Sequence, residues 1–365
     1  MTEDKTRGLR GFALPAVIVA SAIILLLILF AYSAITLNMR RHSLYHDKKQ
    51  QRLDLESALA LYCADSSLCD LGDSAEVELF AGHDAVSVSV KPLGLYETVT
   101  VSNGCPDEYI ALVGRRYESD VNAALWVCDR NRALSIAGDT RIEGYLYMPL
   151  SGINYTEVNK RYYTGDPIPE SLLGISSREL PAVDSAQLRY AGELCRRNCD
   201  KVELRGSARD TVVCGRTVKI KSGFRGSIQV FASDTVIVEC GASLEYPSGI
   251  YVDSGEGQPF VALESGAKLS GYIIVTNSNT DNRMCYQSYV QEDGAVLEGL
   301  LYVEGSCNIE GDICGAVYIK DCCHCQGGNV YPGTLYDVRI VRGDSLAFPI
   351  FLKGPYRRKM IKKMH

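Results

Sequence analysis

The hydrophobic pattern begins with a continuous apolar run. Residues 12–35 contain no charged side chain. As a helix they span roughly 36 Å, enough to cross about 30 Å of hydrocarbon. A buried core helix is seldom apolar on every side over such a length. A cleavable signal has a shorter apolar region that ends in a small-residue site, and no such site precedes Arg40. We therefore predict a retained transmembrane helix at residues 12–35, after a cytoplasmic leader at residues 1–11.

The helical pattern continues beyond this run. Residues 36–62 contain no Gly or Pro, and Leu55, Leu59 and Tyr62 recur at helical spacing. The pattern predicts a stalk helix with one apolar side, and a helix lying on the membrane surface is the alternative. Together with a small loop closed by two cysteines, the stalk covers residues 36–70.

Short strand-like segments replace the helical period from residue 75. Residues 77–80, 86–90 and 98–101 alternate or are β-branched, and Gly, Pro, Asp and Asn separate them. This pattern is typical of short strands joined by turns. We predict a small antiparallel β region at residues 75–135.

A degenerate repeat follows, in which a turn glycine precedes an apolar residue, a second turn residue and a short apolar strand. Copies begin at Gly138, Gly241, Gly266, Gly294 and Gly305. Glycine permits the bends, and turns stacked about 4.8 Å apart would align the apolar residues in a column. We predict a mainly β fold whose largest part, residues 136–350, is a parallel β-helix. A β-sandwich or barrel with similar hairpin turns is the alternative.

Three segments depart from the repeat. Residues 149–186 contain several prolines and are predicted to form a long loop, and residues 184–199 a short helix. Residues 351–365 contain many Lys and Arg and no acidic residue. We predict a solvated basic tail there, with polysaccharide, lipid headgroups or a partner subunit as alternative contacts.

Fourteen cysteines are many for a chain without an evident metal framework. Their even number, combined with an export-type segment, favours an oxidising compartment and disulfides. The disulfide candidates are Cys63, Cys69, Cys195, Cys199, Cys322 and Cys325. Zinc ligation around Cys322, Cys323, His324 and Cys325 is the alternative, but adjacent cysteines converge poorly on one ion. We predict no metal and no cofactor.

Charge gives a weaker indication. The net charge of −6 is spread thinly and the body has no basic face, so we expect no nucleic acid partner. Arg40, Arg41, Lys48 and Lys49 taken alone would place the body in the cytoplasm. The cysteine content and the β-rich body favour the opposite side. We predict a single pass through the inner membrane, in contact with membrane lipid, with a periplasmic or cell-surface body.

The segment Arg10-Gly11-Phe12-Ala13-Leu14, followed by the apolar run, resembles the start of a type IV prepilin or minor pilin. The resemblance implies processing between Gly11 and Phe12, with Phe12 as the new N-terminus. Ala16 stands where the family has a glutamate, which is similar to minor pilins at a filament tip. A plain uncleaved signal anchor is the alternative. Residues 136–320 resemble polymer-forming or pilus-associated β-helix proteins of bacteria.

Candidate catalytic residues are few, and we predict none. Asn279-Thr280-Asp281 resembles a short motif of polygalacturonase-like hydrolases, but their paired aspartates and Gly-His-Gly are absent. We expect a membrane-anchored structural protein, a minor pilin-like or cell-envelope assembly component that contacts pilus or envelope subunits. An adhesin-like module using Tyr-rich surfaces and a carbohydrate-active enzyme are the alternatives, and either would take a polysaccharide.

Overall fold

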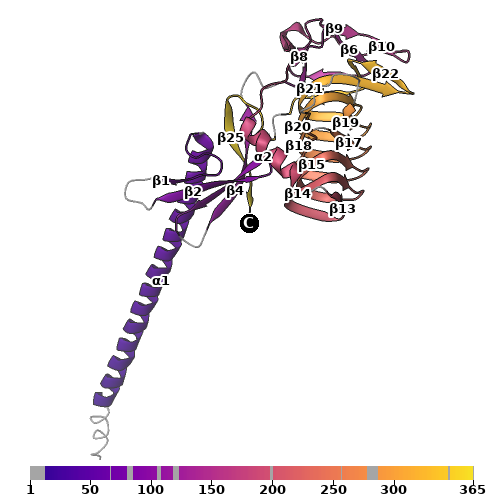
Figure 1. The fold of residues 1–365 in the computed structure, drawn as a ribbon. Coiled ribbons are helices and arrows are strands. Elements are labelled where there is room, and N and C mark those ends of the chain that lie inside the picture. Colours follow the sequence, from indigo (N-terminus) through magenta and orange to yellow (C-terminus); the bar gives the residue numbers. More distant parts are fainter. Residues whose placement is uncertain are drawn as a thin grey trace, which may run out of the picture.

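The computed structural model describes residues 13–65, 67–79, 85–104, 108–117, 123–197, 200–255, 257–277, 287–343 and 346–364. Figure 1 shows a helical rod, a small sheet at one end of the rod, and a stack of strands beside that sheet. The fold is mainly β, with 50% strand and one long N-terminal apolar helix, as predicted.

The rod is α1, Ala13–Ala64, a continuous helix of 52 residues. The predicted transmembrane helix and the predicted stalk are therefore parts of one helix. Leu55, Ala58, Leu59 and Tyr62 are buried in a core shared with the small sheet, so the predicted apolar side of the stalk is confirmed. This end of the helix lies on protein and not on a membrane surface.

The small sheet has the strand order β1-β2-β3-β4-β25, and all its pairs are antiparallel. The strands are β1 Ser74–Val77, β2 Val86–Leu93, β3 Tyr96–Ser102, β4 Tyr109–Tyr117 and β25 Tyr356–Met364. The predicted solvated tail is wrong, because β25 pairs with β4 over its length. Alternation along the strand exposes Arg357 and buries Arg358.

Most of the remaining strands form a parallel stack, whose first strand in the chain is β5. Its strands are β5 Leu125–Val127, β7 Arg141–Glu143, β8 Leu146–Met148, β12 Leu173–Ile175, β13 Lys201–Leu204, β14 Ser207–Ile220, β15 Arg225–Val238, β16 Ser243–Asp253, β17 Phe260–Leu263, β18 Lys268–Thr276, β19 Gln287–Gln291, β20 Val296–Ile309, β21 Asp312–Gln326 and β24 Arg339–Val341. Parallel pairing closes a ring through β15, β16, β18, β20, β19 and β17. The antiparallel hairpins of a sandwich are not the basis of this part.

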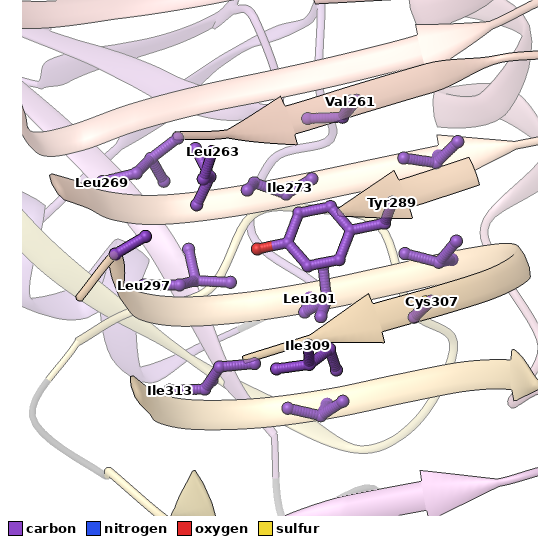
Figure 2. Close-up of a cluster of buried hydrophobic side chains, with 14 of the residues drawn as sticks. Val261, Leu263, Leu269, Ile273, Tyr289, Leu297, Leu301, Cys307, Ile309 and Ile313 are labelled. Atoms are coloured by element: carbon purple, nitrogen blue, oxygen red, sulfur yellow. The ribbon is translucent and has the colours of Figure 1, made fainter. Parts of the chain in front are cut away.

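Residues in register on successive strands share a side of the stack. Ile273 pairs with Leu301, and Leu301 with Val317, and all three are buried in the interior. Figure 2 shows this interior, where aliphatic side chains surround Tyr289. The Tyr289 hydroxyl donates to Gln291 Oε1 at 3.1 Å. The interior is therefore a mainly aliphatic core in which the buried Tyr289 hydroxyl has a partner.

Glycines form a column at one corner of the stack. Gly271 pairs with Gly299, and Gly299 with Gly315. A Cβ at Gly299 would lie 1.9 Å from the Gly271 carbonyl oxygen, and φ at Gly299 is +131°. Two glycines of the predicted copies, at Gly266 and Gly294, precede this column. The copy predicted at Gly305 is misaligned, because Gly305 lies inside β20. Val296 pairs with Asp312, so the turn equivalent to Gly294 lies at Glu310 and Gly311.

A second corner carries glutamates that the sequence reading missed. Glu264 Oε2 accepts the Cys240 backbone N–H at 3.0 Å, and Glu292 Oε2 accepts the Ser265 N–H at 2.9 Å. Each carboxylate thus satisfies a backbone donor of the preceding turn. The recurring Glu-x-Gly-Ala, at residues 239–242, 264–267 and 292–295, is the sequence signal for this corner.

Segments outside the stack cover one end and one side of it. The predicted loop at residues 149–186 contains β9 Ile153–Tyr155, β10 Glu157–Val158, β11 Arg161–Tyr162, the 3₁₀ helix η2 Glu170–Leu172 and β12. β6 Leu134–Ala137 pairs with β9 and with β23 Thr334–Tyr336, and β22 Asn329–Pro332 pairs with β21. The predicted short helix is confirmed as α2, Ser185–Arg196, where Asp184 accepts the Ala186 N–H at 2.9 Å.

Candidate functional site

The first candidate functional surface is the exposed part of α1. Leu14, Phe30 and Tyr32 expose 72%, 74% and 67% of their surface, and the most apolar window of the helix is not buried at all. The helix is long and apolar enough to cross a membrane. Such a surface is stable only in contact with lipid or with other apolar helices. The predicted processing residues Gly11 and Phe12 lie outside the described residues.

The second is the junction that holds α1 to the small sheet. The Tyr62 hydroxyl donates to Glu97 Oε2 at 2.7 Å, and Arg358 Nε lies 3.5 Å from the same oxygen. All three side chains are buried. Burial, followed by the Glu97 carboxylate, raises the pKa of Tyr62, so its hydroxyl stays protonated and donates. Glu97 and Arg358 thus form a buried charge pair, and the neutral Tyr62 hydroxyl donates to the same carboxylate.

Arg358 also closes the C-terminal end of α1. Its Nη1 donates to the carbonyls of Tyr62 and Asp65 at 3.2 and 2.9 Å, and its Nη2 donates to the Cys69 carbonyl at 2.9 Å. The guanidinium lies 3.9 Å from the Tyr62 ring centroid. A cation at this end satisfies carbonyls that have no partner within the helix. The C-terminal strand therefore fixes the direction in which the rod leaves the body.

The candidate disulfides do not form among the described cysteines. Cys63 and Cys69 border the same core as the end of α1 but are not linked, and burial raises the pKa of both thiols. Cys195 is buried on α2, and its candidate partner Cys199 lies outside the described residues. For Cys63 and Cys69 the local grouping in the sequence was therefore a poor guide to bonding, whereas the pair Cys195 and Cys199 stays a prediction.

Cys322 and Cys325 are separated by strand geometry. They lie an odd number of positions apart on β21, so their side chains point to opposite sides of it. Cys322 is part of the interior core, whereas Cys325 Sγ accepts from Gln287 Nε2 at 2.7 Å. Cys323 shares the side of Cys325, and burial raises its pKa to about 11.

The zinc alternative gains no support either. His324 is buried and alternates in the strand with Cys323 and Cys325, so its side chain points away from theirs. Its Nδ1 lies 3.6 Å from Glu310 Oε1, and its ring 4.6 Å from that of Tyr336. The described part of the chain contains no group of three or more His, Cys, Asp or Glu that could hold a metal. Asn279 and Asp281 fall outside the residues that can be placed.

A third feature is an aromatic column on the outer side of the stack. Phe231 pairs with Tyr251, and Tyr302 pairs with Tyr318, which pairs with Trp126. These rings form a second core with residues of the small sheet, α2 and the segment before β25. Lys362 of β25 also forms an ion pair with Asp210 of β14. The Tyr-rich side is therefore the interface between the small sheet and the stack, not an exposed surface.

Sequence reasoning found α1 and the repeat but missed Arg358 and the aromatic column. For Arg358 the signal was weak: in Tyr-Arg-Arg-Lys-Met, residues 356–360, it shares the strand side of Tyr356 and Met360, while Arg357 and Lys359 share the other. Comparisons of the chain with protein-family models, with curated proteins and with solved structures give no match. Function is therefore inferred from α1, its junction and the stack.

Proposed function

We propose that this protein is a membrane-anchored structural component, a minor pilin-like or cell-envelope assembly subunit with its body outside the cytoplasm. One observation carries the proposal. α1 is a single helix whose N-terminal part is exposed and apolar while its C-terminal end is packed on an antiparallel sheet. An apolar rod held rigidly by a folded body suits insertion into lipid or lateral packing against other such rods.

We further propose that the parallel stack is a β-helix. Each strand pairs in register with the strand of the next turn: Arg225 with Ser243, Ser243 with Lys268, Lys268 with Val296, and Val296 with Asp312. The number of residues between paired positions varies from one turn to the next, while the register is kept. This supports a β-helix whose turns carry loops of unequal length. Such a body is a stiff spacer, because each turn is bonded to its neighbours along the axis.

The resemblance at residues 10–14 supports the outside placement of the body, with processing between Gly11 and Phe12. The described cysteines are not joined, so disulfides add no support to this placement. Ala16 in place of the family glutamate supports a terminal or accessory position in an assembly over a repeated one.

Mass spectrometry of the mature N-terminus from membranes tests the proposal. A chain beginning at Phe12 is expected, and Gly11→Ile should block processing and leave Met1 intact in the same membrane fraction. Thiol labelling of intact cells at the exposed Cys240 tests the side of the body. An impermeant reagent that labels Cys240 only after lysis would contradict the outside placement.

The position of α1 neighbours distinguishes assembly from simple anchoring. A photo-crosslinking residue at Leu26 lies on the exposed part of the helix, and one at Leu59 lies in the buried core. Crosslinks from Leu26 to another protein helix are expected, with only intramolecular products from Leu59. Exclusive lipid adducts from Leu26 would reduce the role of α1 to an anchor.

A further inference from the structure

A charged cavity lies at the end of the stack, remote from the free end of α1. It has a volume of about 530 Å³ and is lined by Asp139, Arg141, Arg161, Asp312, Asp337 and Arg339. These residues lie in or beside β7, β11, β21 and β24. Figure 1 shows β10, the partner of β11, and β22, the partner of β21, at the opposite end of the molecule from the rod.

Ion pairs within the protein fix two walls of this cavity. Arg161 Nη1 lies 2.8 Å from Asp337 Oδ2, and the Asp337 Oδ1 accepts the Asp139 backbone N–H at 2.7 Å. Arg161 also donates to the Tyr336 hydroxyl at 3.1 Å. Arg141 Nη2 lies 3.3 Å from Asp139 Oδ1. These four charged side chains thus have their partners before any ligand arrives.

Arg339 and Asp312 are different. They are in register on adjacent parallel strands, and both are exposed. Neither side chain makes a hydrogen bond or ion pair with a residue that the structure describes. The backbone beneath them is rigid, because the Asp312 carbonyl accepts from the buried Gln291 Nε2 at 3.0 Å. A free guanidinium and a free carboxylate therefore lie side by side on a fixed support.

Aromatic rings stand beside the charges. Tyr155 and Tyr163 are stacked, with ring centroids 4.8 Å apart. The Thr164 N–H donates to the Gly138 carbonyl at 3.0 Å, so Tyr163 is adjacent in the chain to a residue bonded to the neighbour of Asp139. Tyr162, on β11, and Tyr145, just before β8, expose 67% and 53% of their surface. Apart from α1, most of the exposed large hydrophobic side chains belong to residues 145–175.

We propose that this cavity binds an acidic saccharide through a uronic acid unit. The planar Arg339 guanidinium matches a sugar carboxylate with two parallel hydrogen bonds. Asp312 accepts hydrogen bonds from sugar hydroxyls, and the Tyr155–Tyr163 pair offers a flat face for the apolar side of a pyranose ring. An apolar anchoring side chain of a protein partner would need a well-packed pocket, whereas this cavity is open and lined by charges.

The site is independent of the side on which the body lies and of processing at Gly11, so its test stands apart from that of the proposed function. The full chain in lipid nanodiscs is titrated by calorimetry with tetragalacturonate and with its methyl ester, which keeps the sugar and removes the charge. We expect binding of the acid and at least tenfold weaker binding of the ester, about the value of one charged hydrogen-bonded contact.

Two variants locate the site. Arg339→Gln should weaken tetragalacturonate binding about tenfold or more, and Asp312→Asn several-fold, with unchanged melting temperatures. Arg225→Gln is the matched control, because Arg225 occupies the same outward column at the other end of the stack through the register Arg225, Ser243, Lys268, Val296, Asp312 and Arg339. Binding by this variant should equal that of the unchanged protein.

Three results would overturn the proposal. The first is the absence of binding to tetragalacturonate and to tetramannuronate at millimolar concentration. The second is an equal loss of binding in Arg225→Gln and Arg339→Gln, which would indicate diffuse charge attraction. The third is tighter binding of an oligoglutamate peptide that also depends on Arg339, which would make the occupant an acidic protein segment.

Discussion

The two sides of the same parallel strands are built from different residues. Ile273 and Ile274 are neighbours on β18, both fully buried, yet the first belongs to the interior core and the second to the outer core. Along the interior the residues in register are aliphatic. Along the outer side most are aromatic. The interior column contains Val230, Ile250, Ile273, Leu301 and Val317, and the outer column Phe231, Tyr251, Ile274, Tyr302 and Tyr318.

The difference follows from what faces each column. Interior residues pack mainly against other strands of the stack, so aliphatic side chains fill most of the space. The outer column meets irregular segments whose carbonyls need donors. Tyr302 donates to the Pro181 carbonyl of the covering segment at 3.4 Å, whereas Tyr251 is 3.0 Å from Oγ1 of Thr276, on β18 of the stack itself. A tyrosine such as Tyr302 fills the gap with its ring and satisfies a carbonyl of the covering segment with its hydroxyl.

The largest expected effect comes from a substitution in the glycine column, which lies on the same strands as the interior and outer columns. In Gly299→Ala the added Cβ would lie 1.9 Å from the Gly271 carbonyl oxygen at a φ of +131°. A backbone atom cannot give way without loss of pairing, so we expect destabilisation of more than about 4 kcal/mol. Urea unfolding of the full chain, followed by far-UV circular dichroism, measures it.

Gly255→Ala is the matched control for this prediction, because an added Cβ there meets nothing within 4 Å. It should change the free energy of unfolding by no more than about 0.5 kcal/mol. Comparable unfolding curves for the two variants would show that the glycine column does not set the spacing of the turns.

An intermediate effect separates the two columns directly. Ile273→Ala and Ile274→Ala remove the same atoms from adjacent, fully buried positions, and each should cost about 2–5 kcal/mol. We expect Ile273→Ala nearer the upper limit, because rigid strands surround the cavity. We expect Ile274→Ala nearer the lower limit, because the rings of Tyr251 and Tyr302, its partners in register, can shift into the space.

Hydrogen exchange read by mass spectrometry locates each loss. Ile273→Ala should speed exchange in β16, β18 and β20. Ile274→Ala should speed it mainly in the segment that contains Phe348 and Phe351, which covers the outer core. If both variants exchange faster in the same peptides, the interior core and the outer core unfold as one cooperative unit and do not differ in this respect.

The sequence predicts the interior column better than the outer one for a physical reason. Turn glycines such as Gly266 and Gly294, each followed by an apolar strand, are local signals. Register between turns of unequal length is not local, so Gly305 was mistaken for a corner that lies at Glu310 and Gly311. The same limit applies to the cysteines, because their grouping in the chain does not say which side of β21 each one faces.

The outer core and the junction depend on segments far apart in the chain. Arg358 lies in a basic run that by itself suggests a solvated tail, and only pairing of β25 with β4 places it beside Glu97 and Tyr62. The charged cavity has the same origin, since Asp139, Asp312 and Asp337 come from distant segments. The sequence therefore indicated a stack and an anchor, but not the surfaces that join them or the site at the far end.

The smallest expected effect lies at the edge of the outer column, where two carboxyls are partly buried. Desolvation raises the pKa of Glu304 above 4.5 and that of Asp253 above 3.8, although Lys320 acts on Glu304 and Arg196 on Asp253 in the opposite direction. Because the folded state holds these protons more tightly than the unfolded state, the ionised groups oppose folding at neutral pH. This cost falls as the pH drops through the raised pKa values and is gone below the ordinary ones.

Glu304→Gln should therefore raise the melting temperature slightly at neutral pH, and its advantage over the unchanged protein should vanish toward pH 4. Glu298→Gln, which removes the same charge from the exposed side of β20, is the control. An equal gain from Glu298→Gln at neutral pH would attribute the effect to net charge and not to burial under the outer core.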